Sequence, residues 1–575
     1  MIDLTKPKEI WKAYEAGRDY KNSIDLYKTV EENERFYIGD QWHGLDVPNI
    51  ILPVLNYTKR TTSMLVAKIS ADDIAAKITP FLTDEESENV AKMLSRELDK
   101  VVELQGIKKL CKRGVRNSAV DGDGCIYTYW NADAPTGQDS KGMVAAELIE
   151  NINVYFANPH ATDVQEQRYI IIARRKTVDD VKDRAEQNGV KKDDLDNITP
   201  DTDANQGEDY SDGKLCTLLT VLYKKEGQCS DKGDESVRLR ENHCTVHAVE
   251  CTEKVIVRKE WDTELRRYPI AWLPWEQKRS CMHGEAALTH MIPNQIAINK
   301  VWAGLIRTME RMGFPVLILN RSFMHKDEKG RVTWTGQPGS VLSVEGSPGD
   351  VRNIASYLEG APINPNITTI TDNLTAQTRD TMGTNDATSG NVRPDNASAI
   401  IALQTADTVP LELNRQAYND WIEELYRNIL DMMSVNYGYR MIEWEENDPI
   451  TGKPHNVMKA YDFDTLDYEN LRISVDIGAA SMWSEITQMD TINSIFTSGI
   501  MDDLNRFKLY LETVPDKYLP GKAKMLAYCE EQMQMMQPTV TPNGDADILN
   551  DPYGNDPLGN TPIAPTIGQE GMLNV

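Results

Sequence analysis

A β-rich insertion between two helical stretches constrains the fold of this chain more than any other feature. Apolar residues recur at helical spacing over residues 284–312, where Pro293 lies near a helix start or at a kink. Three short β-rich segments then fall between residues 316 and 344, and helical spacing returns at about 366–381. This order predicts two helices that leave and re-enter one body, with a compact β module between them.

The body of the chain mixes helices and strands. A chain of 575 residues is too long for a single hydrophobic core, so we expect two to four sub-domains. Helices are predicted at 27–36 and 84–105, the second with Thr83 and Glu86 at capping-box spacing. Segments rich in β-branched and aromatic residues predict strands at 125–130, 168–173, 215–221 and 245–258. The predicted fold class is therefore α+β.

Two polar stretches separate these elements. Residues 193–212 hold eight acidic residues and no Lys or Arg, which predicts a solvated loop, with cation binding as the alternative. A Gly-containing stretch at 382–394 leads into a long predicted helix at about 396–437, where Pro410 implies a kink or a break.

The C-terminal part predicts further strands, helices and a tail. A strand pair is expected near 440–477, followed by helices at about 484–499, 501–513 and 519–537. The last 38 residues, from Pro538, hold six Pro and five Gly without Lys or Arg, so we expect them to be disordered.

Charge and cysteine usage narrow the class of protein. The formal net charge is −27 and the pI about 4.8, so the surface as a whole repels nucleic acid and anionic membranes. Between residues 296 and 360, however, basic residues outnumber acidic ones.

No apolar run reaches 18 residues and the N-terminus lacks a signal peptide's apolar region, so we expect neither a membrane span nor export. Eight cysteines without a C-x-x-C pair favour reduced thiols in a cytosol.

Two groups of His and Cys residues are candidate metal ligands. His283 and His290 would share a helix face but lie about 10 Å apart along the axis, too far for one ion unless the helix breaks. In a strand, His243, His247 and Cys251 would point to one face at intervals of about 13 Å, and only a tight turn would join them. We expect capping or packing roles, with a metal-dependent hydrolase as the alternative function.

The sequence carries none of the common signatures of catalysis. It has no G-x-x-x-x-G-K-[ST] phosphate loop and no G-x-S-x-G nucleophile motif. Gly122-Asp-Gly124 lacks a third glycine and precedes a predicted strand, which indicates a turn. We therefore predict no catalytic residue, no metal and no cofactor.

Two short motifs are similar to those of one known family. Asn33-Glu-Arg-Phe-Tyr-Ile-Gly-Asp-Gln-Trp42, followed by Pro53-Val-Leu-Asn-Tyr-Thr-Lys59, resembles a family pattern F-Y-x-G-x-Q-W … P-x-x-N. His283-Gly-Glu285 through Pro293-Asn-Gln-Ile-Ala-Ile-Asn299 resembles the start of that family's first stem helix. With the insertion between two helices, the chain resembles the portal proteins of tailed bacteriophages, rings at one capsid vertex through which DNA is packaged and ejected.

The resemblance implies a division of the chain into the parts of a portal subunit. By position these are the wing at 1–280, the first stem helix at 284–313, the clip at 314–365, the second stem helix at 366–381, the tunnel loop at 382–395, a long helix and wing return at 396–480, the crown at 484–537 and the tail at 538–575.

The resemblance also implies candidate residues along the DNA path. On the first stem helix these are Lys300, Arg307 and Arg311, of which the last two share a face at i, i+4 spacing. In the tunnel loop they are Thr384, Asn385, Asp386, Ser389 and Asn391, with Arg393 as the phosphate contact. In the clip, Lys326, Lys329 and Arg331 are candidates for binding partner proteins. Ordinary surface exposure is the alternative for each.

The partners implied by the resemblance are those of a portal. They are further copies of the chain in a ring of twelve, the major capsid protein, a scaffolding protein, a terminase, a head-tail connector or adaptor, and double-stranded DNA in the channel. The implied location is the virion, with assembly in the host cytoplasm. Another capsid or tail adaptor ring is the alternative, and it would lack the inserted module.

Overall fold

The computed structural model describes most of the chain up to residue 477. The described residues are 6–47, 51–71, 74–81, 85–136, 140–201, 214–226, 244–312, 316–319, 355–358, 366–381, 409–447, 454–466, 468 and 471–477, with a few more between 511 and 529. The chain divides into two compact units, Met1–Trp483 and Ser484–Val575, and the elements below belong to the first.

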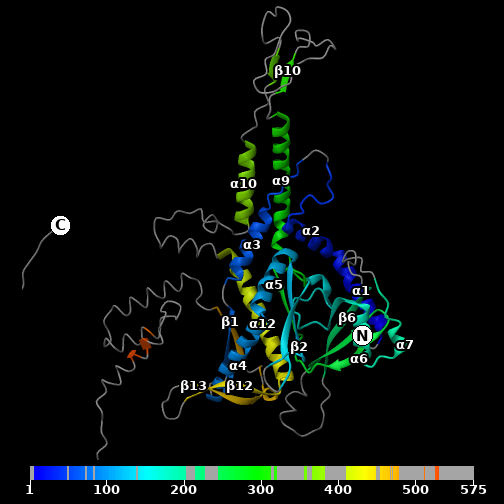
Figure 1. Cartoon of the computed structure of the whole chain (residues 1–575), viewed down its shortest axis with the longest axis vertical. Helices are drawn as coiled ribbons and strands as arrows, with labels where there is room; N and C mark the ends of the chain where they lie inside the picture. Colours follow the sequence, from blue (N-terminus) through cyan, green and yellow to red (C-terminus); the bar gives the residue numbers. More distant parts are fainter. Residues whose placement is uncertain are drawn as a thin grey trace, which may run out of the picture. The chain divides into compact units, whose positions relative to one another are not determined.

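Helices and antiparallel sheets both contribute to this unit, so the predicted α+β class is confirmed (Figure 1). The α-helices are α1 (Pro7–Ser23), α2 (Leu26–Ile38), α3 (Tyr57–Ile69), α4 (Glu85–Leu104), α5 (Ile107–Asp121), α6 (Val178–Gln187), α7 (Lys192–Leu195), α9 (Ala287–Met312), α10 (Asn366–Thr381) and α12 (Glu412–Asn436). Short 3-10 helices lie at η1 (Asn151–Asn153), η4 (Val409–Leu411) and η5 (Phe463–Thr465).

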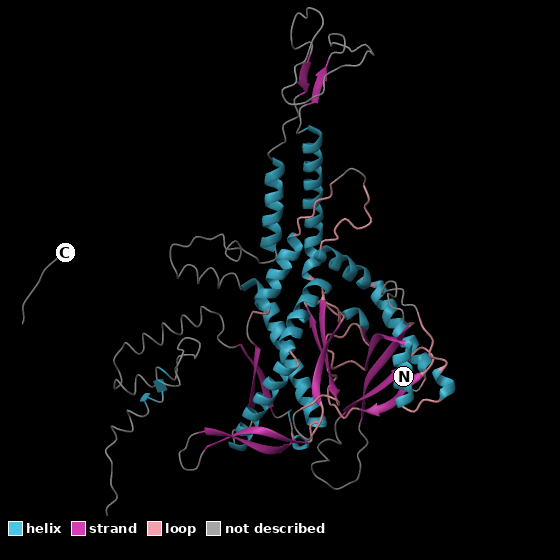
Figure 2. Ribbon diagram, in the orientation of Figure 1, coloured by secondary structure: helices cyan, strands magenta, loops and turns pink. Residues whose placement is uncertain are grey.

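Among the described residues, the strands form two larger sheets and three pairs (Figure 2). The first sheet has the order β3 (Met143–Ile149), β2 (Asp123–Asn131), β9 (Ile270–Pro274). The second has the order β4 (Val154–Phe156), β5 (Tyr169–Thr177), β6 (Leu215–Glu226), β7 (Cys244–Cys251), β8 (Ile256–Asp262). The pairs are β1 (Ile74–Pro80) with β14 (Leu471–Ile477), β10 (Val316–Leu319) with β11 (Ala355–Leu358), and β12 (Tyr439–Asn447) with β13 (Pro454–Asp462).

The main core lies where α4, α5 and α12 meet the three-stranded sheet. Fully buried side chains come from α4 (Leu94, Leu98) and from α12 (Ile422, Leu425, Ile429) at helical spacing, because each helix turns one apolar face inward. A second cluster forms where α1 places Ile10 and Tyr14 against one face of the five-stranded sheet.

Two glycines at the junction of α5 and β2, Gly122 between them and Gly124 in β2, let the helix and the strand approach closely. Gly122 ends α5 with a φ of 101°, a conformation that L side chains rarely adopt. A Cβ on Gly124 would lie 2.5 Å from the carbonyl oxygen of Gly114. The predicted turn is therefore confirmed only at Gly122, because β2 already begins at Asp123.

Several helix predictions are confirmed with small shifts in their ends. The helices expected at 84–105 and 366–381 are α4 and α10. The one expected at 284–312 is α9, which begins at Ala287 and continues through Pro293. Pro410 lies in η4, directly before α12 begins at Glu412, so α12 starts only after this proline. Residues 396–408, where the first part of the long helix was expected, lie outside the described residues, so the kink or break that Pro410 implies stays a prediction.

Other local predictions were wrong. The segment 245–258 is two strands, β7 and β8, because a tight turn bonds Thr252 N to Val255 O at 2.8 Å. The acidic stretch 193–212 is not a loop throughout. It begins within α7, and Asp201 forms an ion pair with Arg175 and accepts from Thr217 N at 3.1 Å. A nearby arginine outweighs the tendency of a charged stretch to stay solvated.

Some predicted elements lie outside the described residues. They are the strands at 331–334 and 341–344, the stretch at 382–394 with the start of the helix at 396, the tail from 538, and most of the helices expected between 484 and 537.

Candidate functional site

The paired helices α9 and α10 carry the candidate residues that the structure describes. The two helices run side by side (Figure 2), and Asn294 Nδ2 of α9 donates to Thr378 Oγ1 of α10 at 3.0 Å. Lys300 and Arg307 are exposed on α9 and have no ion-pair or hydrogen-bond partner among the described residues. Seven residues separate them, so they share one helix face about 10 Å apart along the axis.

The structure does not describe the side chains of the other candidates. Arg311 lies within α9, but its side chain is outside the described set. Residues Thr384, Asn385, Asp386, Ser389, Asn391 and Arg393, and likewise Lys326, Lys329 and Arg331, also lie outside the described residues. Their roles stay predictions.

A buried glutamine fixes the base of α9 to the first turn of α3. Gln295 is 1% exposed, and its Nε2 donates to Leu55 O at 2.6 Å and to Asn299 Oδ1 at 2.9 Å. Its Oε1 accepts from Tyr57 N at 3.1 Å and from Thr58 N at 3.4 Å. The first N–H groups of a helix have no partner within that helix, so Gln295 of α9 caps α3.

The two motifs of the sequence meet at this joint. Asn299 Nδ2 donates to Gln41 Oε1 at 2.6 Å, and Asn33 Nδ2 donates to Thr289 Oγ1 at 2.9 Å. Asn56 caps α3 by accepting from Lys59 N at 2.9 Å. Five of these six polar residues lie in one of the two quoted motifs, and the sixth, Thr289, lies on α9 between the two quoted parts of the second motif. The motifs therefore describe a single structural joint, which fixes where α9 leaves the body.

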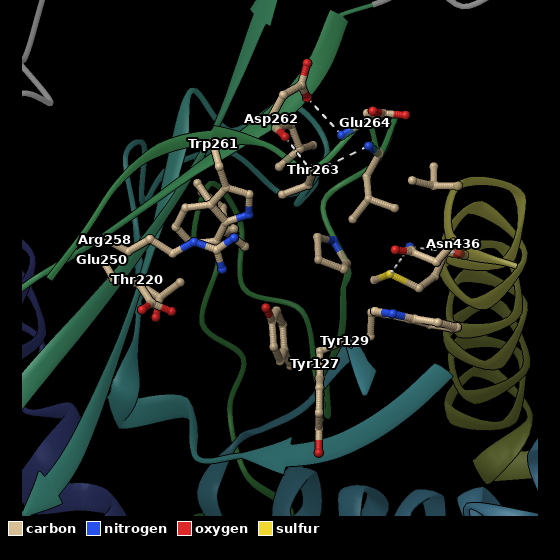
Figure 3. Close-up of a pocket in the computed structure, with 18 of the residues that line it drawn as sticks. Tyr127, Tyr129, Thr220, Glu250, Arg258, Trp261, Asp262, Thr263, Glu264 and Asn436 are labelled. Carbon is tan, nitrogen blue, oxygen red and sulfur yellow. Dashed lines mark hydrogen bonds between the residues drawn. The ribbon is translucent and has the colours of Figure 1, made fainter. Parts of the chain in front are cut away.

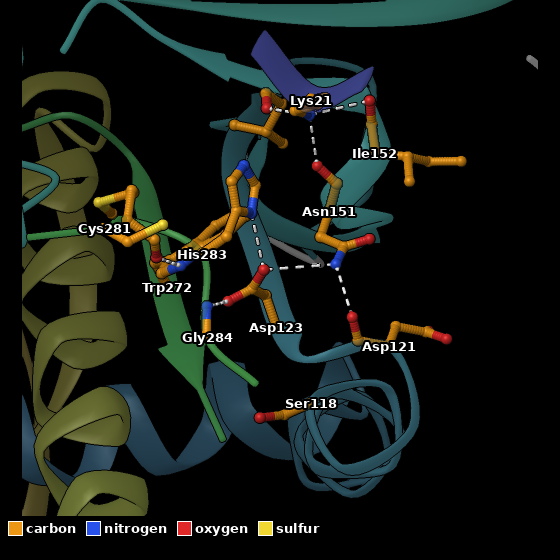
Figure 4. Close-up of polar contacts among 12 residues, drawn as sticks. Lys21, Ser118, Asp121, Asp123, Asn151, Ile152, Trp272, Cys281, His283 and Gly284 are labelled. Atoms are coloured by element: carbon orange, nitrogen blue, oxygen red, sulfur yellow. Dashed lines mark hydrogen bonds and ion pairs between the residues drawn. The ribbon is translucent and has the colours of Figure 1, made fainter. Parts of the chain in front are cut away.

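A second group of buried polar residues holds the segment that precedes α9 in the sequence (Figure 4). Asp123, at the start of β2, is fully buried and accepts from His283 Nδ1 at 2.8 Å and from Gly284 N at 2.8 Å. Asn151 Nδ2 donates to the same carboxylate at 3.3 Å. Lys21 Nζ of α1 lies close by and donates to Asn151 O, Ile152 O and Val154 O at 2.7, 3.0 and 2.6 Å. We call these residues the Asp123 cluster.

The Asp123 cluster is a structural anchor. Burial lowers the pKa of His283 below 6.5, although Asp123 opposes the shift. Burial likewise lowers the pKa of Lys21 well below 10.5, again opposed by the charge of Asp123. Buried polar groups of this kind are stable only when each finds a partner, as these do. The cluster therefore positions the segment that enters α9.

The candidate metal ligands have other partners. His283 precedes α9 and bonds Asp123, whereas His290 lies on α9 with its Nε2 3.5 Å from Glu285 Oε1. On β7, His247 lies between Glu260 and Asp262 at 3.1 and 3.7 Å, and Cys251 is buried. His243 is outside the described residues. Among the described residues, no group of three or more His, Cys, Asp or Glu side chains could hold a metal ion.

Sequence reasoning found the joint's motifs but not its contacts, and it missed Lys21, Asp123 and Asn151. The helical periodicity of α1 gives no sign that one lysine is buried, because its acceptors lie about 130 positions further along the chain. Within the part of the chain that the structure describes, no helix is both long and apolar enough to cross a membrane.

Comparison with known protein families places most of the chain in one of them. The family model described as phage P22-like portal protein matches residues 12–439, which includes most of α1, both motifs, α9, α10 and α12. No curated protein matches the chain.

Proposed function

Because this chain belongs to the P22-like phage portal protein family, we propose that it assembles into a closed ring at one capsid vertex, through which DNA enters and leaves. The resemblance to portal proteins noted in its sequence is thereby confirmed. The family match carries the proposal, because it extends over about three quarters of the chain and includes both helices beside the β module. Twelve copies, with the virion as the final location, are part of the proposal.

The division into portal parts is also proposed. Residues 1–280 would form most of the wing, 284–313 and 366–381 the stem, 314–365 the clip, 382–395 the tunnel loop and 484–537 the crown. The two stem helices correspond to α9 and α10, which gives this assignment its best support. The clip and the rest of the ring would dock terminase, the connector or adaptor, scaffolding protein and the major capsid protein.

The charge of the chain suits a channel that releases DNA readily. Each phosphate that a basic residue neutralises strengthens binding, so a channel lined by many of them would hold DNA and slow it. An acidic ring with a few basic residues keeps DNA near the axis and offers weak contacts. Lys300 and Arg307, exposed and unpaired among the described residues, are the proposed contacts on α9. The chain itself would perform no reaction, and terminase would supply the energy of packaging.

The native mass of the purified protein tests the ring. Light scattering should give about 780 kDa for twelve copies of 64.9 kDa, and negative-stain images should show a central hole. A stable monomer that stays monomeric when scaffolding protein is added would contradict the proposal. A ring of another size would correct only the number of copies.

A further inference from the structure

The connection between α2 and α3 exposes an apolar surface. Its sequence from Gly44 to Val54 carries a single charged residue, Asp46. Large apolar side chains that are between 37% and 61% exposed lie in it and at the end of α2, and we call them the apolar loop surface: Ile38, Leu45, Val47, Ile51 and Val54. Monomeric proteins rarely expose apolar side chains gathered in this way, which indicates a surface that another chain covers.

Hydrogen bonds hold this loop beside the base of α9. Trp42 Nε1 donates to Pro53 O at 3.0 Å, which closes the loop, and Leu45 N donates to Trp42 O at 3.0 Å. Gln41 Oε1 accepts from Asn299 of α9 at 2.6 Å. The apolar loop surface therefore has a defined position relative to α9.

Three sides of α9 have different surroundings. Asn294 faces α10, and Asn299 faces the loop through Gln41. With 3.6 residues per turn, Asn294 and Asn299 lie about 140° apart around the helix axis. Lys300 and Arg307 lie on the third side, about 80–100° from Asn299. They are about 120–140° from Asn294. Figure 2 likewise shows α10 and most of the loop on different sides of α9.

Helix α10 presents a row of uncharged side chains beside its contact with α9. The contact is made by Thr378, which is buried. The row lies about 80–140° around the helix from Thr378. Its members are exposed at i, i+4, i+7 and i+11 spacing, and we call them the α10 row: Asn366, Ile370, Asn373 and Gln377. None carries a charge although 26% of the chain's residues do, and the centres of protein–protein contacts are depleted of charged residues.

These positions fit the geometry of a ring. When Lys300 and Arg307 face the channel axis, as proposed above, α10 and the loop lie on the two flanks of α9, where a copy meets its neighbours. A closed ring repeats one head-to-tail contact, in which two different surfaces of the same chain meet. A surface on one flank must therefore match a surface on the other.

We propose that the apolar loop surface of one copy packs against the α10 row of the next copy, with Leu45 and Ile51 around Ile370. Burial of these exposed side chains stabilises the contact, and the amides of the row satisfy the polar backbone of the loop. This inference rests on the proposed ring and names the surfaces that close it.

Cross-linking of a Leu45→Cys, Ile370→Cys double variant of the full-length protein tests the contact. A short bismaleimide added to the assembled ring should join position 45 of one copy to position 370 of the next. A denaturing gel should then show a ladder of products at multiples of 64.9 kDa, up to the full ring. The two single variants control for the native cysteines, of which Cys244 is exposed.

The products distinguish the kinds of failure. A ring in which the double variant gives no product beyond those of the single variants would refute the contact alone. Products that stop at dimers would also refute it, because they indicate a two-fold contact in place of a head-to-tail one. A parent protein that forms no ring, measured first by light scattering, would refute the proposed function together with this inference.

Apolar substitutions test the contact without a cross-link. Leu45→Ser with Ile51→Ser should raise at least tenfold the protein concentration at which half of the chains are in rings. The melting temperature of the unassembled chain should stay unchanged, because both side chains are more than half exposed. Leu104→Ser, which alters an equally exposed leucine at the end of α4, should assemble as the parent does. Equal assembly of the loop variant and Leu104→Ser would contradict the proposal.

Discussion

Replacing Gln295 by leucine should release α3 from the base of α9. The substitution keeps the approximate size of the side chain but removes its amide. Three atoms, Leu55 O, Tyr57 N and Asn299 Oδ1, then lose the hydrogen bond that Gln295 makes to them. Three of the four hydrogen bonds are 3.1 Å or shorter, and the residue is 1% exposed. A buried group left unpaired costs about 1–3 kcal/mol, and Tyr57 is only half-buried, so water recovers part of the loss. The expected destabilisation is about 2–4 kcal/mol.

Hydrogen exchange measures this loss at the amides concerned. Opening of the first turn of α3 should become about 30-fold to 1,000-fold more frequent, since each 1.4 kcal/mol is a factor of ten. The peptide covering residues 54–62, followed by mass spectrometry, should report that change. His290→Ala, which removes a half-exposed side chain from the same part of α9, should leave exchange there unchanged. If Gln295→Leu exchanges no faster than His290→Ala, the joint does not fix α3 and the reasoning fails.

Three further predictions concern the core, pH and DNA. Gly124→Ala should lower the melting temperature markedly because its Cβ meets backbone at 2.5 Å, whereas Gly304→Ala in α9, with open space around it, should raise stability by about 0.5–1 kcal/mol. Burial raises the pKa of Asp431 from 3.8 to about 6, so its ionised form is disfavoured in the fold above pH 6 and this cost disappears as the pH falls toward 4. Asp431→Asn should therefore stabilise by about 1–3 kcal/mol at pH 8 and by little near pH 4, and thermal melts at both values check the sign. Lys300→Gln with Arg307→Gln should leave the ring's mass unchanged but alter the rate of DNA packaging in an assay with terminase and proheads, and a rate equal to the parent's would contradict contact with DNA.

The sequence predicted long periodic elements better than the contacts between them. Helix α4 shows a clear apolar face, with Leu94 and Leu98 one turn apart, and its bounds were predicted within one residue. Helices α3 and α5 were both missed. Helix α5 carries five basic residues, and its buried face is set by packing against β2 and α12. Such a face is recognised only when its partners are known.

At the candidate site, too, the sequence predicted the motifs but not the contacts between them. The positions of Gln41, Asn56 and Gln295 stood out as parts of motifs, but nothing in their spacing says that one caps a helix 240 positions away. A cleft of about 690 Å³ between the two sheets was not predicted at all (Figure 3). Part of its wall, with Trp261 and Asp262, comes from β8, which lies beside β7 only because the chain turns between the two strands, and that turn falls within a segment predicted as one strand.

The pairing of β1 with β14 has a consequence for synthesis on the ribosome. The two strands match residue for residue from Ile74 with Ile477 to Pro80 with Leu471, so β1 leaves the ribosome long before its partner exists. At 5–20 residues per second the delay is on the order of 20–80 s. Meanwhile Ile78 N can already bond Ser95 Oγ of α4 at 3.1 Å, which holds β1 on one side only. The other edge of β1 stays unpaired until almost all of the first unit has been synthesised. A nascent chain that stalls before residue 471 therefore presents an unpaired strand edge to which chaperones or other chains can bind.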